Sequence, residues 1–486
     1  MLAGLLAILM VCGLPGDASA QPARHEASHR FLIVSDIHFN PMSDRSLTND
    51  LAAAAPAQWE KILERSQPAA VSQYGEDTNW WLLKSSLHAM QATAPQPSFI
   101  MITGDVLAHE FPRKFQAASG KSDREAYRNF VNKTIEFLGL QLRHRFPATP
   151  IYLTPGNNDE DCGNYSVQAG GEFLRDTAPI VRELAKGDAS LAQSWKELGS
   201  YEVTPAVLHG TRILSLNTVF FSDKYQPDNF NAGCAQANSD GPERAFAWLQ
   251  SRLADARRAH AKVWLMFHIP PGVDAYMSAQ NFRRSLEQGG TAQDACGKAA
   301  IPMWVPSWTQ RFVNLLQEFS DTAVASFAGH THADDFRLVH GSASQPGFVL
   351  ISPAISPIYN QNPAFRVVNV DGEGTLTDAA VYYLTNLTFA SRTTPGDWQR
   401  EYSFSSQWKL PKIDASSLSE ILVRIQKDAG VRDDYLKLYN VTSPAVYVDA
   451  KYGAALDCAI ENLAPEAFNR CYCSTYEQRE KTGKPH

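Results

Sequence analysis

The chain has 486 residues, of which 44% are hydrophobic, and a formal net charge of −7. This length and hydrophobic content suffice for one large domain with an appendage. The acidic balance and the lack of a basic tract exclude binding of a nucleic-acid duplex as the main purpose, because the phosphate backbone requires a positive field. A small phosphorylated substrate is still compatible with this charge, since bound metal ions reverse its sign locally.

The first twenty residues have the pattern of an export signal. The apolar run from Met1 to Leu14 is shorter than the ~18 residues that a transmembrane helix needs. It is followed by Ala18-Ser19-Ala20, which has the small residues of a signal-peptidase site. We therefore expect a signal peptide over 1–20 and no stable membrane insertion. The mature chain would be exported, to a secreted, periplasmic or lysosome-like location.

Apolar runs and amphipathic stretches alternate along the chain in the order typical of an α/β protein. Three helices are predicted, over 79–92, 123–142 and 242–259. The predicted strands are 30–36, 98–105, 150–159, 199–204, 211–217, 262–268 and 322–332, followed by an antiparallel run of 347–353, 364–371 and 377–384.

The segment from Ile269 to Ser307 has weak periodicity and is predicted as a long loop. It holds Trp304 and Trp308, for which packing in the core or at its rim is preferred to contact with a membrane surface.

Composition changes after about residue 390, and the tail has a mainly helical pattern. We therefore divide the mature chain into a catalytic domain, 30–392, and a helical C-terminal subdomain, 393–486.

Seven cysteines occur, and removal of the signal peptide leaves six. An even number in an exported chain favours up to three disulfides. Cys471 and Cys473 are too close in sequence to bridge to each other comfortably, so each should have a different partner. Cys162 is expected to tie its loop either to Cys234 or to Cys296.

Polar residues that can bind metals follow several of the predicted strands. Strand ends in α/β sheets converge on one edge, where ligands bind. Each motif alone is common, and His268 alone would read as a core histidine, but the whole set in this order indicates a site for two divalent cations. Mixed nitrogen and oxygen ligands suit Zn²⁺, Mn²⁺ or Fe²⁺. The candidate ligands are Asp36, His38, Asp105, Asn157, His268, His330 and His332.

The order D-x-H, G-D, G-N, H, G-H-x-H resembles that of the calcineurin-like metallophosphoesterases. Within that family the chain is similar to the acid sphingomyelinase-like phosphodiesterases. The similarity rests on GDVLAH, which places His109 four residues after Asp105, and on SPAISPIYNQNPAFRV (352–367) and YYLTNLT (382–388). It extends from about residue 30 to the end of the chain. The resemblance implies a four-layer sandwich of two mixed β-sheets flanked by helices.

The resemblance also implies roles for these residues. A hydroxide that bridges two metal ions attacks phosphorus in line, and His109 protonates the leaving oxygen as general acid. One ion is held by Asp36, His38, Asp105 and His332, and the other by Asp105, Asn157, His268 and His330. In the tail, the spacing of Cys458 and Cys471 resembles a cysteine pair of the family and implies a disulfide, with Cys473 as the rival partner of Cys458.

Three departures from the family's patterns concern substrate and metal. Asn158 stands where most members have a histidine; its amide can bind a phosphoryl oxygen but cannot supply a proton. Ala108 stands where purple acid phosphatases carry a tyrosine, which favours two divalent ions, zinc first, over ferric iron. Only about ten residues lie between Ala20 and the first strand. The lipid-presenting module of acid sphingomyelinase does not fit there, which favours soluble diesters or nucleotides.

We therefore expect an exported dinuclear-metal phosphodiesterase that acts on a small phosphorylated substrate, and no partner protein is predicted. The Gly-Asn-Asn-Asp pattern of 156–159 also resembles endopolyphosphatases. The alternative is thus a phosphomonoesterase, nucleotidase or endopolyphosphatase that acts on phosphoanhydrides with the same site. A catalytically silent, metal-bound binding domain is the third reading, against which the complete ligand set argues.

Overall fold

The structure is a computed structural model that describes residues 28–226, 234, 240–340, 347–445 and 450–482. The predicted signal peptide lies outside these residues. Among the helices in the described ranges, none combines the length and the apolar character that a bilayer crossing demands.

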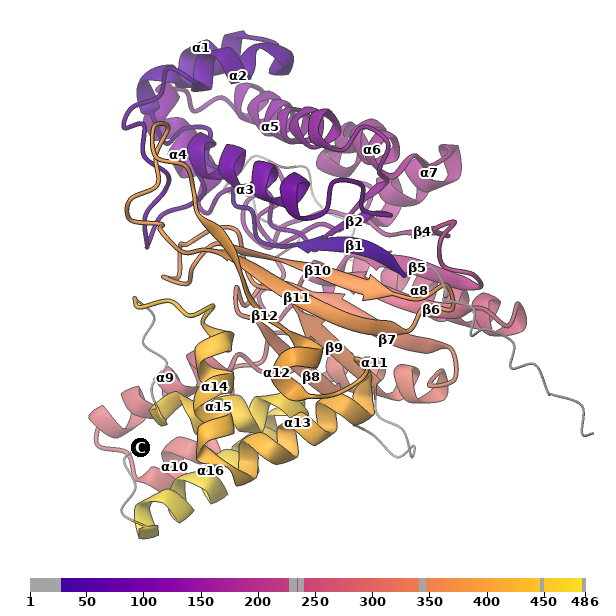
Figure 1. Ribbon diagram of the computed structural model, residues 1–486, viewed down its shortest axis with the longest axis vertical. Helices are drawn as coiled ribbons and strands as arrows, with labels where there is room; N and C mark the ends of the chain where they lie inside the picture. Colours follow the sequence, from indigo (N-terminus) through magenta and orange to yellow (C-terminus); the bar gives the residue numbers. More distant parts are fainter. Residues whose placement is uncertain (1–27, 227–233, 235–239, 341–346, 446–449, 483–486) are drawn as a thin grey trace, which may run out of the picture.

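Two six-stranded mixed sheets form the centre of the molecule (Figure 1). The first has the order β12-β11-β10-β1-β2-β3, with β1, β2 and β3 parallel and with β10, β11 and β12 added antiparallel beside β1. Its strands are β1 (His29–Val34), β2 (Ile100–Ile102), β3 (Ile151–Leu153), β10 (Ala364–Val370), β11 (Leu376–Leu384) and β12 (Trp398–Ser403).

The second sheet has the order β4-β5-β6-β7-β9-β8. Strands β5, β6, β7 and β9 are parallel, and β4 and β8 close the two edges antiparallel. Its strands are β4 (Tyr201–Val203), β5 (Thr211–Leu216), β6 (Lys262–Phe267), β7 (Ala323–Ala328), β8 (Asp335–Val339) and β9 (Gly347–Ile351).

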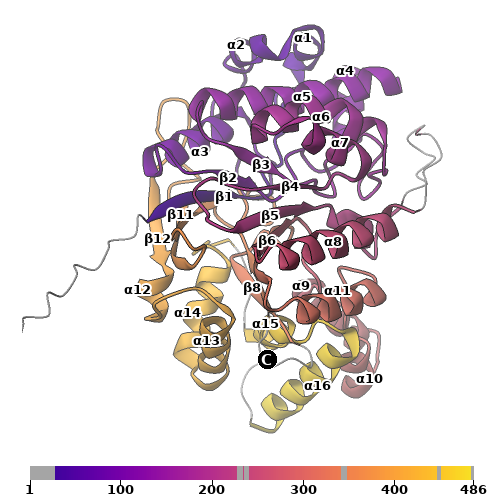
Figure 2. The same cartoon turned by 90° about the vertical axis from the view of Figure 1, so that its right-hand side faces the viewer.

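Helices cover the outer faces of the two sheets. Figures 1 and 2 show α3, α5, α6 and α7 over the first sheet, and α8 and α11 beside the second. The helices are α1 (Thr48–Ala53), α2 (Trp59–Leu63), α3 (Trp80–Thr93), α4 (Phe111–Ser119), α5 (Arg124–Arg145), α6 (Glu172–Ala185), α7 (Ala189–Leu198), α8 (Gly241–Arg258), α9 (Ala275–Glu287), α10 (Ala292–Gly297), α11 (Pro306–Glu318), α12 (Phe404–Trp408), α13 (Ala415–Lys427), α14 (Ala429–Tyr439), α15 (Ala450–Glu461) and α16 (Pro465–Thr482). Within the described residues, short 3₁₀ helices occur at Arg45–Leu47, Pro56–Gln58 and Thr218–Phe221. The expected four-layer sandwich is confirmed.

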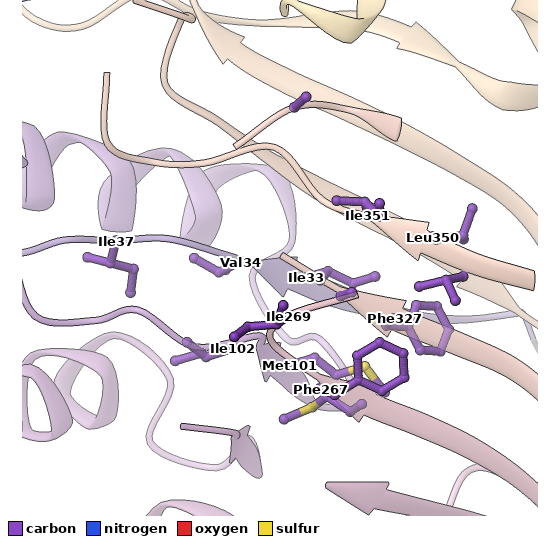
Figure 3. Packing of buried hydrophobic residues seen from close by; sticks show 14 of the residues in the cluster. Ile33, Val34, Ile37, Met101, Ile102, Phe267, Ile269, Phe327, Leu350 and Ile351 are labelled. Atoms are coloured by element: carbon purple, nitrogen blue, oxygen red, sulfur yellow. The ribbon is translucent and has the colours of Figure 1, made fainter. Parts of the chain in front are cut away.

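The core between the sheets is built by aromatic and aliphatic side chains from both. Phe31 in β1 stacks on Phe99 with ring centroids 4.6 Å apart, and it meets Trp264 of β6 at 5.5 Å. Phe327 of β7 completes the group, and all four residues are fully buried. Figure 3 shows aliphatic residues of β1, β2 and β9 packed near Phe267 of β6 and Phe327 of β7. This close-packed apolar interface holds the ends of β1, β2, β6 and β7 at fixed positions.

The helices predicted from periodicity are confirmed because strong local signals bound them. The side chain of Asn79 accepts a hydrogen bond from Leu82 N at 3.0 Å and caps α3. Asp123 caps α5 in the same way, with Ala126 N as donor at 2.7 Å. Such caps satisfy the free N–H groups of a first helical turn. The observed strands at the predicted positions are shorter, since 98–105 and 150–159 also contain the loops that follow β2 and β3.

The structure corrects two expectations drawn from the sequence, the first of which concerns residues 269–307. The predicted loop from Ile269 to Ser307 contains α9 and α10, each capped by a side chain, Asp274 for α9 and Thr291 for α10. Those two caps were the missed signal, because the helices behind them are too polar or too short to show clear periodicity. Trp304 is fully buried, in agreement with the expected packing in the core. The ring centroid of Trp308 lies 5.1 Å from that of Phe221.

The predicted antiparallel run is confirmed for β10 and β11 but wrong for β9, which belongs to the other sheet. β9 pairs with β7 and β8 in the second sheet, whereas β10 and β11 pair with each other in the first. The chain crosses between the sheets after Ile351. Alternation along a strand does not encode its neighbour, and β8, which supplies the antiparallel partner of β9, was not predicted.

The tail continues the first sheet and then forms helices beside the second (Figure 1). β12 is hydrogen-bonded to β11, and helices α13 and α15 contact β8. Buried side chains of the tail, Phe404 and Phe468 among them, join the same hydrophobic cluster as the sheets. The domain boundary at residue 393 stays a prediction.

Three disulfides account for the six cysteines that follow the predicted signal peptide. Cys162 bonds Cys234, which selects one of its two predicted partners. The predicted bond between Cys458 and Cys471 is confirmed. The third joins Cys296 to Cys473, so that Cys471 and Cys473 have different partners, as expected, and α16 is tied to α10.

Candidate active site

The seven predicted ligands come together at one edge of the molecule, where five strands of the two sheets end. Asp36 and His38 follow β1, Asp105 follows β2 and Asn157 follows β3. In the second sheet His268 directly follows β6, and the loop after β7 carries His330 and His332. All are buried except His330, which is partly exposed. Both sheets therefore contribute to a single polar cluster.

The backbone at this edge turns sharply. Five of the seven residues have positive φ angles: 49° at Asp36, 45° at His38, 53° at Asp105, 76° at His330 and 63° at His332. Residues other than glycine rarely adopt this conformation, and each instance costs on the order of 1–3 kcal/mol. Its concentration here shows that the surrounding sheets hold the loops in shapes that aim these side chains at one another.

The glycines of the G-N and G-H motifs allow the loops to approach closely. A Cβ at Gly156 would lie 2.1 Å from Oδ1 of Asp105, and one at Gly329 would lie 2.0 Å from Oγ of Ser35 and 2.7 Å from Oδ2 of Asp36. All three distances are shorter than non-bonded atoms tolerate, so a side chain at either position would push the carboxylates out of place. The glycines are thus part of the site although they offer no donor.

The first group of donor atoms surrounds Nε2 of His38. This nitrogen lies 3.6 Å from Oδ1 of Asp36, 3.5 Å from Oδ2 of Asp105 and 3.1 Å from Nε2 of His332. Nε2 of His332 is in turn 3.3 Å from Oδ1 of Asp36. Ligands held about 2.0–2.2 Å from one tetrahedral cation lie roughly 3.3–3.6 Å apart. The spacing fits one divalent cation.

The second group surrounds Nε2 of His268. This nitrogen lies 3.2 Å from Oδ2 of Asp105, 3.0 Å from Oδ1 of Asn157 and 3.3 Å from Nδ1 of His330. The amide nitrogen of Asn157 donates to Oδ1 of Asn164 at 2.9 Å, so its oxygen faces the group. Oδ2 of Asp105 belongs to both groups. Among the atoms of the predicted ligands, it alone lies close to both His38, at the centre of the first group, and His268, at the centre of the second.

The remaining hydrogen bonds leave lone pairs directed at the cluster. Nδ1 of His38 donates to Leu107 O at 2.9 Å, and Nδ1 of His268 donates to Thr103 O at 2.7 Å. Each Nε2 is then unprotonated in the neutral ring, as metal ligation requires. Oδ1 of Asp36 is buried and has no hydrogen-bond partner within the described ranges. Lone pairs gathered at about 3 Å need a cation between them, so these residues fit a pair of divalent ions.

Electrostatics divides the four imidazoles into two kinds. Burial disfavours the charged form of all four, but the neighbouring aspartates overcome it at His38 and His268 and raise their pKa to about 9. At His330 burial together with repulsion from His268 lowers the pKa to about 3, and at His332 burial lowers it to about 4. The aspartates attract positive charge, yet the four imidazoles do not all become protonated. Both properties are expected of a site that binds cations.

His109 lies at the mouth of the first group. Its ring stacks on His38 with centroids 3.9 Å apart, and its Nδ1 is 2.8 Å from Oδ1 of Asp77. Lys114 bonds the other carboxylate oxygen of Asp77. Burial alone would raise the pKa of Asp77, but the hydrogen bond from His109 and nearby positive charge lower it to about 2. Asp77 therefore stays ionised and orients the imidazole.

The donor atoms of His38, His109 and His332 all lie within 4.8 Å of one another. His109 is thus near enough to approach a cation as well, although the chain offers a complete set without it. Asp77 was missed by sequence reasoning, since a carboxylate shortly before α3 reads as part of a helix start.

Asn158 and Asp159 join the loops that follow β2 and β3. The backbone N of Asn158 donates to Oδ1 of Asp105 and its side-chain amide donates to Oδ2, both at 2.8 Å. The predicted contact of Asn158 with substrate stays a prediction. Oδ1 of Asp159 accepts from the backbone N of Val106 and Leu107 at 2.8 and 3.0 Å. Asp159, also missed from sequence, fixes the loop that carries Asp105.

Residues 29–334 match the family described as calcineurin-like phosphoesterase, which is well over half of the chain. The chain is similar to acid sphingomyelinase-like phosphodiesterase 3b of Homo sapiens, at 24% identity over 96% of this chain and 94% of that protein. It is 23% identical to a cyclic GMP-AMP phosphodiesterase of Mus musculus, over 97% of this chain and 98% of that protein. A sphingomyelinase phosphodiesterase C of Dictyostelium discoideum is 25% identical over 91% and 92%. All three matches extend well past residue 334.

Proposed function

The chain belongs to the calcineurin-like phosphoesterase family, a family of metal-dependent hydrolases, and from this premise we propose that it hydrolyses phosphodiester bonds in small substrates. The observation that carries the proposal is the pair of donor groups that share Oδ2 of Asp105, 3.5 Å from His38 and 3.2 Å from His268. One carboxylate between two sets of imidazole and amide donors is suited to two adjacent cations.

Asp36, His38, Asp105 and His332 would hold one ion, and Asp105, Asn157, His268 and His330 the other. Two bound divalent ions, zinc first because Ala108 offers no phenolate, would supply a nucleophile at neutral pH and neutralise charge on the phosphoryl group. The carbonyl oxygens of Leu107 and Thr103 keep the ligand imidazoles in the required tautomer. The amide of Asn158 keeps Asp105 oriented.

His109 is the proposed general acid. Hydrolysis adds water across a P–O bond: the water oxygen becomes bonded to phosphorus, and a proton must reach the departing oxygen. With Nδ1 directed to Asp77, Nε2 of His109, which lies 3.4 Å from the hydroxyl of Tyr359, is the nitrogen that would hold that proton at the mouth of the site. Asp77 fixes the orientation of the ring.

The names of the relatives support the substrate class. Sphingomyelin and cyclic GMP-AMP are different molecules that share a phosphodiester, so a phosphodiester is the feature we carry to this chain. Three disulfides, together with these relatives, support an exported protein that acts in a secreted or lysosome-like location.

The test is a substrate panel on purified protein. Bis(4-nitrophenyl) phosphate and 4-nitrophenyl phosphate should be separated by a higher kcat/KM on the diester. Sphingomyelin, a cyclic nucleotide, a nucleoside triphosphate and polyphosphate then define the natural class, with the Asp105→Asn protein as control for contaminating enzymes. Faster hydrolysis of the monoester or of polyphosphate than of any diester would contradict the proposal. Bound metal without any turnover would identify a binding domain instead.

A further inference from the structure

Tyr359 is an exposed aromatic side chain at the mouth of the site, and the roles above do not use it. It is 57% exposed, although its ring centroid lies only 4.6 Å from that of His332 and 5.7 Å from that of His109. Its hydroxyl is 3.4 Å from Nε2 of His109. The ring thus stands beside the nitrogen from which the leaving oxygen would take its proton.

The loop that carries Tyr359 is braced from two directions. On one side Gly75 N donates to Pro357 O at 3.0 Å, and the hydroxyl of Tyr74 donates to Oδ1 of Asn362 at 2.6 Å. On the other side the amide of Asn362 donates to Val441 O at 2.9 Å, beyond the end of α14. These bonds join three distant segments of the chain, so the loop that carries Tyr359 is held in place before a substrate arrives.

We propose that Tyr359 forms the wall of the leaving-group subsite and selects phosphodiesters whose leaving group is a planar aromatic ring. This inference rests on the proposed function, because His109 defines the side from which the leaving group departs. A group bonded to the oxygen beside His109 must lie against the neighbouring tyrosine ring. An aromatic leaving group stacks on that ring, whereas an aliphatic one of the same acidity gains only apolar contact.

The experiment compares two methyl phosphodiesters whose leaving alcohols have similar acidity but different shapes, phenyl methyl phosphate and hexafluoroisopropyl methyl phosphate. The selectivity measured is the ratio of kcat/KM for the aryl ester to kcat/KM for the alkyl ester. Tyr359→Leu should lower this ratio roughly three- to tenfold, the range of an aromatic pair. Tyr359→Phe and Tyr359→Trp should keep it within about twofold, because each retains a ring.

Phe389 is the matched control. It is 77% exposed and lies in the connection between β11 and β12, so Phe389→Leu removes an exposed ring elsewhere and should leave the ratio unchanged. Metal content is measured for every variant, which separates a lost wall from a damaged site.

Two results would overturn the inference. An unchanged ratio in Tyr359→Leu would show that the ring does not contact the leaving group. Equal losses on both esters in Tyr359→Leu and Tyr359→Phe would assign the effect to the hydroxyl near His109 instead. The unmodified protein tests the proposed function separately. If it hydrolyses neither ester, the proposed function fails and the inference fails with it. If both are hydrolysed and the ratio is constant, only the inference fails.

Discussion

Two buried polar clusters lie almost next to each other in the chain but differ in how their charges are balanced. The active-site cluster includes His332, and a second cluster begins two residues later with Asp334 and Asp335. In the second cluster Asp334 is bonded to Arg366, and Asp335 to Arg337. Every one of these four residues is buried.

Tyrosine hydroxyls complete the second cluster. Tyr402 donates to Asp334 and Tyr435 donates to Asp335, each at 2.6 Å. The cluster lines a cavity of about 40 Å³, which has room only for a few water molecules. Its charges are paired by the chain itself, so it needs no ligand and serves to join the tail to the second sheet.

The active-site cluster is different because it contains more metal-ligating atoms than hydrogen-bond donors or cations to pair them. Imidazole nitrogens, carboxylate oxygens and the amide oxygen of Asn157 face one another at 3.0–3.6 Å. The arginine side chains that pair the second cluster have no counterpart among the seven predicted ligands. Burial of unbalanced polar groups is costly and persists only where something else compensates. Buried charge alone therefore does not indicate a ligand site. Buried lone pairs that no side chain of the protein pairs do indicate one.

The largest effect should come from Asp105→Asn, which tests the unbalanced cluster. The shared carboxylate loses its charge, so both ions should be lost together and kcat on a diester should fall roughly 10³-fold. Elemental analysis of protein purified without chelator measures the loss of the ions, and initial rates measure the fall in kcat. Asp77→Asn, which removes a buried carboxylate outside the ligand set, should keep both ions. A variant at Asp105 that retained two ions per chain would contradict the shared ligand.

His109→Ala should cost roughly 10²–10⁴ in kcat on diesters with poor leaving groups, because the departing oxygen needs a proton. The loss on nitrophenyl esters should be much smaller, since their leaving oxygen departs as an anion. Metal content should be unchanged. Equal losses on both kinds of ester, or loss of an ion, would show that His109 positions the substrate or binds metal, as its place near His38 and His332 also permits.

Arg366→Met tests the balanced cluster and should lower stability without removing metal. It leaves Asp334 buried with only a tyrosine as partner, which costs about 3–5 kcal/mol in the free energy of unfolding. Denaturant unfolding measures this loss. Arg65→Met, whose partner Asp50 is more than half exposed, is the control and should cost about 0–1 kcal/mol. Similar losses in both variants would mean that the buried pair is no more important than a surface one.

A smaller effect is expected at Glu401, which borders the balanced cluster. Its Oε2 is buried without a hydrogen-bond partner in the part of the chain that the structure describes, and burial raises its pKa from 4.5 to about 8. Between these values the unfolded chain releases the proton while the folded chain keeps it. Stability should therefore fall as pH rises through this window.

Glu401→Gln stays neutral and should remove that slope, with a gain on the order of 2 kcal/mol at pH 8 and almost none at pH 4.5. Unfolding in denaturant at both pH values measures the difference. Glu136→Gln, at an exposed position of α5, is the control and should show no such gain. A gain that is equal at both pH values would exclude titration of Glu401 as its cause.

The candidate ligands could be read from the amino-acid sequence, and the family resemblance implied the architecture that presents them. Asp36, Asp105 and His268 could be found because each follows a short apolar run, and the ends of parallel strands must meet at one edge. The helices α3, α5 and α8 were predictable for the same kind of reason, since periodicity and caps act over a few residues.

Contacts between residues far apart in the sequence depend on the tertiary fold. Asp77 is 32 residues from His109, and Tyr359 is 250 residues from it, yet both contact the same ring. Likewise Cys162 had two acceptable partners, and the fold chose Cys234. Local patterns reflect interactions within a turn of helix or along one strand, whereas these contacts depend on the paths of long connections through the packed sheets, which no local spacing records.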